Sequence, residues 1–285
     1  MPAPLLAVDG PSLLYRSFFA LPDSIKDGAG QPANALLGFT NATLRICLDE
    51  GPRAVVICWG REAARYRKRA YPPYHADRPP VPDALAAQWA GIEEWLATFG
   101  WPSVTSADLE ADDLLHAFSR AEEAAGGTCL LLTGDRDMFQ SATERTAVLY
   151  LKTGVKGFER YGPAEVGERY GIPPALVPDF IALRGDPSDG LPGAKGIGEK
   201  GAADLLRRHG SLEAAIAGCL RESPRVRAAL HDHAAEVLMF KDVATLRTPE
   251  VELPPDAPTD VARGAAAARE RGLDALAKRL EGGPS

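Results

Sequence analysis

Short apolar runs alternate with segments of helical periodicity through the first half of the chain. The runs, which we expect to form buried strands, cover residues 5–10, 53–60, 128–137 and 146–151, with a short strand at 104–105. The segments with helical periodicity cover residues 12–21, 34–50, 83–100 and 110–125. Strands that alternate with helices predict an α/β fold with a central, mostly parallel sheet.

Carboxylates gather where these strands end and where one helix begins. They are Asp9, Glu110, Asp112, Asp113, Asp135 and Asp137. Capping of a helix N-terminus would by itself explain the three acids at 110–113. In open parallel sheets, however, ligands bind beyond the carboxyl ends of the strands. A shared site for a hard divalent cation therefore explains all the acids with one arrangement.

Residues 61–82 differ in composition from their surroundings. They include six lysines and arginines, two acids, three tyrosines and five prolines. The prolines predict a loop, which is either simply solvated or in contact with nucleic acid. Basic groups that alternate with aromatic rings favour contact with phosphates and bases.

The second half of the chain predicts helices. They cover residues 163–170, 174–183, 199–209, 211–217, 224–240 and 261–280. Two further acids, Asp186 and Asp189, precede a glycine-rich stretch from Gly193 to Lys200. This stretch is not a P-loop, because Glu199 separates Gly198 from Lys200 and no strand precedes it. It is either a tight turn between helices or a backbone cradle for phosphate, and its two lysines favour the cradle.

Bulk properties limit the class of protein. The chain has 285 residues and a net charge of −7, which argues mildly against a nucleic-acid partner unless the basic residues are segregated. Its four cysteines form no CxxC pair and predict buried thiols. No apolar run reaches membrane-spanning length, and the start Met1-Pro2-Ala3 lacks a basic segment, so we expect a cytoplasmic protein. No feature of the sequence argues for an oligomer, so we expect a monomer.

These motifs, in their order, resemble the structure-specific 5′-nucleases, which include the 5′-nuclease domain of bacterial DNA polymerase I and the flap endonucleases. The matching stretches are Val8-Asp9-Gly10, Tyr15-Arg16, Tyr66-Arg67, Tyr71 to Arg78, Glu110 to Asp113, Thr133 to Asp137, Gly185 to Asp189 and Gly193 to Lys200. Each stretch is weak alone, and the ordered set is specific.

The resemblance implies a PIN-like nuclease domain over residues 1–165 and a helical region over 166–285. The helical region would contain a helix-three-turn-helix DNA clamp at 185–210 and a C-terminal helical tail. The implied activity is hydrolysis of DNA near free 5′ ends, flaps or branches with Mg²⁺ or Mn²⁺ at two sites. Any DNA polymerase would act in trans.

The resemblance also implies roles for individual residues. The acids that match its metal site are Asp9, Glu110, Asp112, Asp113, Asp135, Asp137, Asp186 and Asp189. The basic residues assigned to catalysis are Arg16, Arg67, His75 and Arg78, of which His75 and Arg78 match the pair that handles the scissile phosphate. The residues assigned to duplex DNA and a potassium ion are Gly193, Lys195, Gly196, Ile197, Gly198 and Lys200.

Two positions depart from the family pattern. Gly60 stands where the family has a metal-site aspartate, and His75 stands where it has a lysine. Glu62 is near the first position, although glycine itself offers no ligand. One metal site is therefore expected to be weakened, and Gly60→Asp is expected to raise cleavage if the site is otherwise intact. The alternatives are a catalytically inactive protein that binds branched DNA and an RNA-cleaving PIN-type nuclease, which the glycine-rich stretch disfavours.

Overall fold

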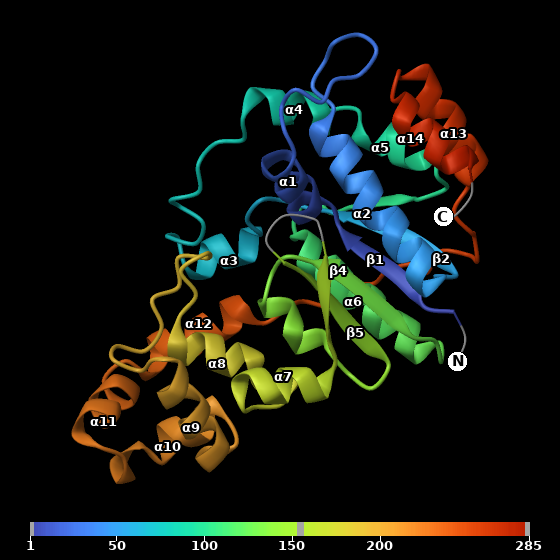
Figure 1. The fold of residues 1–285 in the computed structure, drawn as a ribbon. Helices are drawn as coiled ribbons and strands as arrows, with labels where there is room; N and C mark the ends of the chain where they lie inside the picture. Colours follow the sequence, from blue (N-terminus) through green and yellow to red (C-terminus); the bar gives the residue numbers. More distant parts are fainter. Residues whose placement is uncertain (1–2, 153–156, 283–285) are drawn as a thin grey trace.

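A six-stranded sheet forms the centre of the N-terminal half (Figure 1). The computed structural model describes residues 3–152 and 157–282. The strands are β1 (Leu5–Asp9), β2 (Ala54–Trp59), β3 (Ser103–Thr105), β4 (Cys129–Thr133), β5 (Thr146–Leu151) and β6 (Phe158–Tyr161). Their order across the sheet is β3-β2-β1-β4-β5-β6.

The first five strands pair in parallel, as the sequence predicts. Parallel pairing places the carboxyl ends of β1 and β4 beside each other, with Val8 opposite Leu132. Strand β6 was not predicted, and it pairs antiparallel to β5 at the edge of the sheet. The acids that follow β1 and β4 are therefore brought to the same edge.

Helices of the N-terminal half flank this sheet. They are α1 (Gly10–Ala20), α2 (Asn34–Glu50), α3 (Arg65–Ala70), α4 (Asp83–Trp89), α5 (Ile92–Ala97), α6 (Ala111–Ala124) and the 3₁₀ helix η1 (Asp137–Ser141). The expected loop at 61–82 is thus corrected, because α3 forms within it. The single helix expected at 83–100 is also corrected, because it is interrupted between Trp89 and Ile92.

The helical region follows β6. Its elements are α7 (Pro163–Tyr170), η2 (Pro174–Leu176), α8 (Val177–Arg184), α9 (Glu199–His209), α10 (Leu212–Ala217), η3 (Cys219–Arg221), α11 (Pro224–His231) and α12 (Ala234–Ala244). The tail forms α13 (Val261–Glu270) and α14 (Asp274–Glu281). The helices expected at 224–240 and 261–280 are therefore each two helices. Gly272, with a φ of +72°, lies at the second break.

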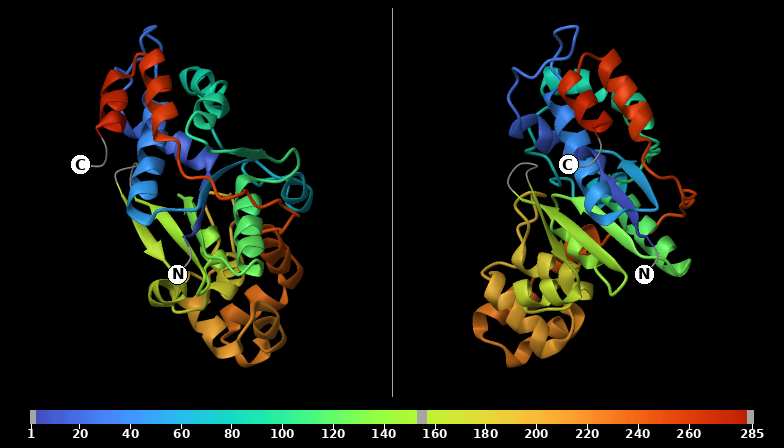
Figure 2. Two further views of the ribbon diagram at one scale, coloured as in Figure 1. Left: turned by 90° about the vertical axis from the view of Figure 1, so that its right-hand side faces the viewer. Right: turned by 45° about the vertical axis from the view of Figure 1, so that its right-hand side comes forward.

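Alternate residues of β1 and its neighbours enter two different hydrophobic cores. Leu6 and Val8 pack with α1, α2, α5 and the tail helices, whereas Leu5 and Ala7 pack with α6 and α8. In both views of Figure 2, α13 and α14 lie at the opposite end of the molecule from α9–α11. The tail that the sequence groups with the helical region therefore packs on the N-terminal half.

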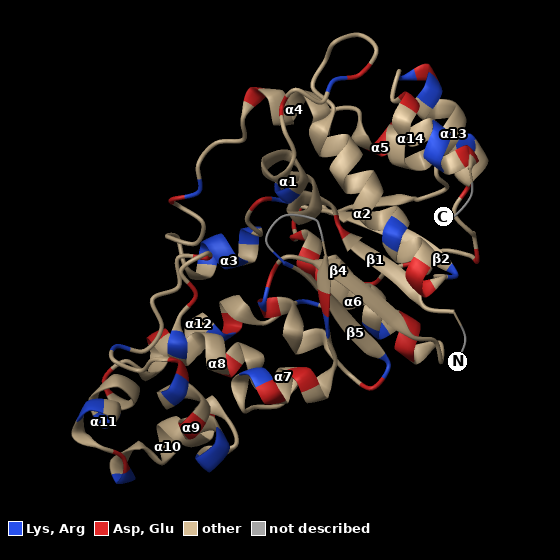
Figure 3. Cartoon of the chain, in the orientation of Figure 1, with Lys and Arg blue, Asp and Glu red and all other residues tan. Residues whose placement is uncertain are grey.

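Charge is distributed unevenly over this framework. Basic segments lie on α3, acidic segments lie near the start of α6, and basic and acidic segments are mixed over α9–α11 (Figure 3). Among the described residues, no helix combines the length and apolar character needed to cross a lipid bilayer. The basic helix α3 thus lies next to the acidic start of α6.

Candidate metal centre and nucleic-acid cleft

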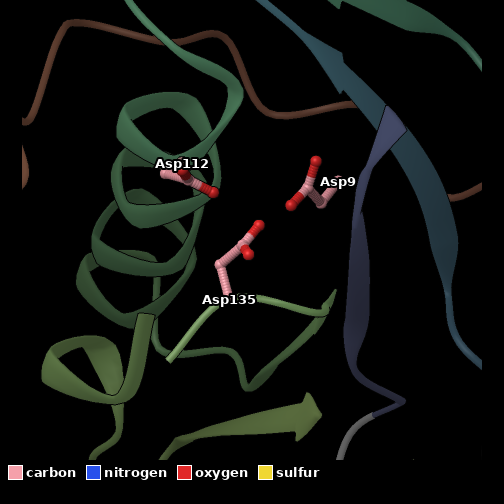
Figure 4. A group of neighbouring side chains, drawn as sticks. All are labelled: Asp9, Asp112 and Asp135. Atoms are coloured by element: carbon pink, nitrogen blue, oxygen red, sulfur yellow. The ribbon is translucent and has the colours of Figure 1, made fainter. Parts of the chain in front are cut away.

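Three carboxylates converge at the carboxyl edge of the sheet (Figure 4). Asp9 ends β1, Asp112 lies in the first turn of α6, and Asp135 follows β4. One oxygen of each lies within 4.8 Å of one oxygen of each of the others. Three of the eight predicted metal-site acids are therefore brought together by elements that are far apart in the sequence.

Local hydrogen bonds fix Asp9 in this group. Its Oδ1 accepts a 3.0 Å hydrogen bond from the backbone N–H of Ser12, and through this bond Asp9 caps the N-terminus of α1. Its Oδ2 accepts a 2.7 Å bond from the hydroxyl of Thr133, at the end of β4. These bonds orient the carboxylate without neutralising its charge.

Ionisation of these three carboxylates is energetically unfavourable when no cation is bound. Burial and then the nearby charge of Asp135 raise the pKa of Asp9 from 3.8 to about 7. Burial and the neighbouring acids also hold the pKa values of Asp112 and Asp135 above their usual range. In addition, Asp112 Oδ1 is buried and has no hydrogen-bond partner. Carboxylates that repel one another around an unpartnered oxygen fit a hard divalent cation.

A second group of acids adjoins the first. Burial, then the charge of Asp189 and then that of Asp135, raise the pKa of Asp137 well above its usual range. Asp189 also accepts from His75 Nε2 at 2.9 Å and pairs with Arg78 at 3.5 Å. Asp186 instead accepts from the backbone N–H and hydroxyl of Ser188 and so shapes its own loop.

The remaining two acids belong to a buried network around Arg67. The Arg67 guanidinium pairs with Glu110 at 2.9 Å and with Asp113 at 3.1 Å, and its side chain is 2% exposed. Glu110 also accepts from the backbone N–H of Ala64 and the hydroxyl of Tyr74. Both carboxylates are thus already bonded within the protein, and their ligation of a metal stays a prediction.

The predicted basic residues have different surroundings. Arg67 is enclosed by the network above, away from solvent. Arg16 donates a 2.6 Å bond to the carbonyl of Gly134 and lies against that glycine, where a side chain would displace it. Its charge lowers the pKa of the neighbouring Asp135, opposing the effect of burial. Of the predicted basic residues, Arg16 thus lies beside Asp135, and His75 and Arg78 lie beside Asp189.

Gly60 is packed against backbone. A Cβ at this position would lie 2.6 Å from Leu109 O and 2.6 Å from Ala111 N. These are backbone atoms at the start of α6, which cannot rotate away as a flexible side chain does. The place of the family's expected aspartate is therefore occupied by the chain itself.

A cleft of about 1230 Å³ extends from Asp9 and Asp135 along α1. Its lining includes Tyr15 and Phe19 of α1 and Trp89 of α4. Phe19 is 61% exposed, and its ring centroid lies 4.8 Å from that of Tyr15. Sequence reasoning missed Phe19, although its spacing of four residues from Tyr15 places both rings on one helix face.

The glycine-rich stretch forms a tight turn between α8 and α9. Gly193 and Gly196 have φ values of +69° and +83°, which favour glycine. The buried side chain of Ile197 anchors the turn in the core, whereas Lys195, Gly198 and Lys200 are exposed. Exposed backbone between two lysines is consistent with the predicted phosphate cradle.

Comparison with known proteins agrees with this arrangement. A family model described as "5'-3' exonuclease, N-terminal resolvase-like domain" matches residues 4–171, and one described as "5'-3' exonuclease, C-terminal SAM fold" matches residues 172–264. The junction between them lies close to the predicted domain boundary after residue 165, which stays a prediction.

Two curated relatives are DNA polymerases I. The Mycobacterium tuberculosis (strain H37Rv) protein is 36% identical over 254 residues, which cover 86% of this chain and 28% of that protein. The thermostable Thermus thermophilus protein is 36% identical over 280 residues, which cover 98% of this chain and 32% of that protein. The chain thus spans less than a third of the length of either relative.

Solved structures share the fold. The bacteriophage T5 5′-exonuclease with bound zinc ions has a TM-score of 0.69 at 17% identity, covering 98% of this chain and 97% of that one. The catalytic core of Rad2 in complex with a DNA substrate has a TM-score of 0.60 at 16% identity, covering 97% and 92%. The predicted fold class is confirmed. Because the two family models together match residues 4–264, the chain belongs to the 5′-3′ exonuclease family.

Proposed function

We propose that the protein is a divalent-metal-dependent 5′-nuclease that hydrolyses DNA phosphodiester bonds near free 5′ ends, flaps or branches. The observation that carries this proposal is the convergence of Asp9, Asp112 and Asp135, two of which, Asp9 and Asp135, line a cleft of about 1230 Å³. The unpartnered Oδ1 of Asp112 supports occupancy by a cation. Membership of the 5′-3′ exonuclease family supports hydrolysis of DNA from the 5′ end.

The acids would hold the metal, which we propose to be Mg²⁺ or Mn²⁺. Asp9, Asp112 and Asp135 offer one site, and Asp137, Asp186 and Asp189 border a second, weaker one. When bound, such cations activate water for attack on phosphorus and stabilise the negative charge that develops on the leaving oxygen. Glu110 and Asp113, which pair with Arg67, would orient Asp112 through the first turn of α6, and their contact with the metal stays a prediction.

Basic residues of the protein flank these acids. Arg16 lies beside Asp135, and His75 and Arg78 lie beside Asp189. The positive charges of Arg16 and Arg78 are suited to holding the scissile phosphate against the carboxylates, which would otherwise repel it. Arg67 would act indirectly, because it fixes Glu110 and Asp113 at the start of α6.

The glycine-rich turn would hold duplex DNA. Lys195 and Lys200 supply charge, and the exposed backbone of Gly196 and Gly198 allows close approach. A potassium ion held by carbonyl oxygens of this turn is part of the proposal. The alternative of an inactive DNA-binding protein gains little support, because clustered acids would repel DNA unless a cation neutralised them.

Cleavage of a 5′-labelled flap substrate tests the proposal. The wild-type protein should release the flap in Mg²⁺ or Mn²⁺ and not in EDTA, and Asp135→Asn should abolish release while retaining the fold. Asp108→Asn serves as the matched control, because Asp108 is an exposed acid that pairs with Arg65 outside the acidic groups. Tight flap binding without cleavage in either metal would contradict the proposal.

A further inference from the structure

Arg225 of α11 extends its side chain over the glycine-rich turn. A Cβ at Gly196 would lie 2.6 Å from Nη2 and 2.8 Å from Cζ of Arg225. The guanidinium therefore occupies the space into which a side chain at position 196 would project. The φ of +83° at Gly196 disfavours any such side chain, so the charge above the turn comes from a neighbouring helix.

The positive charge of Arg225 is not neutralised within the described part of the chain. Arg225 is exposed and makes no ion pair or side-chain hydrogen bond there. Glu222, the acid nearest to it in sequence, is bonded instead to Arg208 at 2.7 Å and to His209 at 2.8 Å. An unpaired guanidinium held beside exposed backbone is therefore available to an external anion.

Two lysines extend this charge along the turn. Lys195 and Lys200 are exposed, and within residues 3–152 and 157–282 they too make no ion pair. The basic segments around α9 and α11 in Figure 3 mark the same part of the molecule. Three cations thus surround a stretch of backbone that a ligand can approach closely.

We propose that Arg225 is a further DNA-binding residue of this turn and that it contacts a phosphate of the duplex. The proposal rests on the function proposed above and adds a contact from α11, 29 residues after Gly196. Guanidinium groups bind phosphate through two parallel N–H bonds, which fix the direction of the backbone as well as attract it. Arg225 accordingly positions the duplex and takes no part in bond cleavage.

Equilibrium binding of a blunt duplex, measured by fluorescence anisotropy in EDTA over a series of KCl concentrations, tests the proposal. Arg225→Gln should weaken binding roughly three- to tenfold, and it should reduce the slope of log affinity against log salt by roughly 0.9. Arg227→Gln, on the same helix, is the matched control and should change affinity less than twofold, since Arg227 is bonded to the Glu222 carbonyl. Binding of a single-stranded oligonucleotide should not change with either variant.

Equal effects of the two variants, or an equal loss for single and double strands, would overturn the proposal. Both substitutions replace exposed side chains, so matching thermal unfolding curves are expected and exclude misfolding. Flap cleavage in the same preparations separates the two proposals. Wild-type cleavage with unchanged duplex binding by Arg225→Gln refutes the role of Arg225 alone, whereas absent wild-type cleavage refutes the nuclease proposal alone.

Discussion

The Cα of Gly60 faces the backbone nitrogen of Ala111 so closely that a Cβ on Gly60 would lie 2.6 Å from that nitrogen. The start of α6 therefore occupies the space that a side chain at position 60 would need. Since α6 carries Asp112, the same close approach sets the distance of that acid from Asp9. The sequence-based expectation that an aspartate at position 60 would improve the site needs to be reversed.

Gly60→Ala and Gly60→Asp should both destabilise the protein. The added atoms must displace backbone at 109–111, and overpacking of this kind costs about 1–3 kcal/mol. Urea unfolding should reveal the loss, and flap cleavage should fall with both variants. Gly91→Ala is the control, because a Cβ at Gly91 meets no atom within 4 Å. A gain in cleavage by Gly60→Asp would show that the site accepts the side chain.

Arg67→Lys should lower stability more than it lowers the affinity for DNA. Lysine keeps a positive charge but cannot bond Glu110, Asp113 and the Val243 carbonyl together, as Arg67 does. Disrupting a buried ion pair by removing one partner costs about 3–5 kcal/mol, which sets the upper limit for this substitution. Denaturant unfolding and DNA binding at low temperature separate the two effects. Arg69→Gln, which changes an exposed residue of α3, should leave stability unaltered.

The metal-free protein should become less stable as pH rises from about 4 to about 7. The folded-state pKa of Asp9 is about 7 against 3.8 when unperturbed, so the folded state holds a proton that the unfolded state has lost. Thermal unfolding in EDTA should therefore give a higher midpoint at the acidic end of this window. Mn²⁺ should restore the midpoint at the neutral end, and Asp112→Asn should reduce both effects. A pH-independent midpoint in EDTA would contradict the repulsion inferred for these acids.

His75 should contribute to cleavage by holding Asp189 in place. Its ring contacts the Glu62 carbonyl at 2.7 Å and Asp189 Oδ1 at 2.9 Å. His75→Ala removes both contacts, so flap cleavage should fall while the exposed control Asp108→Asn cleaves as the wild type does. Unchanged cleavage by His75→Ala would show that these contacts are not needed.

Sequence reasoning predicted most of the fold because the strands are continuous apolar runs with clear ends. It missed β6, since Phe158–Tyr161 is short, polar and dependent on pairing with β5. It also missed α3, whose six residues carry almost no apolar periodicity and whose helix depends on the burial of Arg67. Local pattern alone does not report such tertiary contributions.

The candidate site could be predicted only in part for the same reason. The acids at strand ends were found because a parallel sheet brings such ends together. That Gly60 is packed against residues 109–111, and that Arg225 lies over Gly196, are contacts between segments with no shared periodicity. A glycine read from sequence alone indicates a missing side chain, whereas the structure identifies what fills its space.

The bond from Arg67 Nε to the Val243 carbonyl, at 2.9 Å, links α3 to α12 of the helical region. The same guanidinium binds the two acids at the start of α6. Separation of the helical region from the sheet would therefore break this bond and the 2.8 Å bond from the Arg247 N–H to Asp113, and it would expose the buried ion pairs of Arg67 to water. We expect the nuclease half and the helical half to unfold together in one cooperative transition, although they match two different family models.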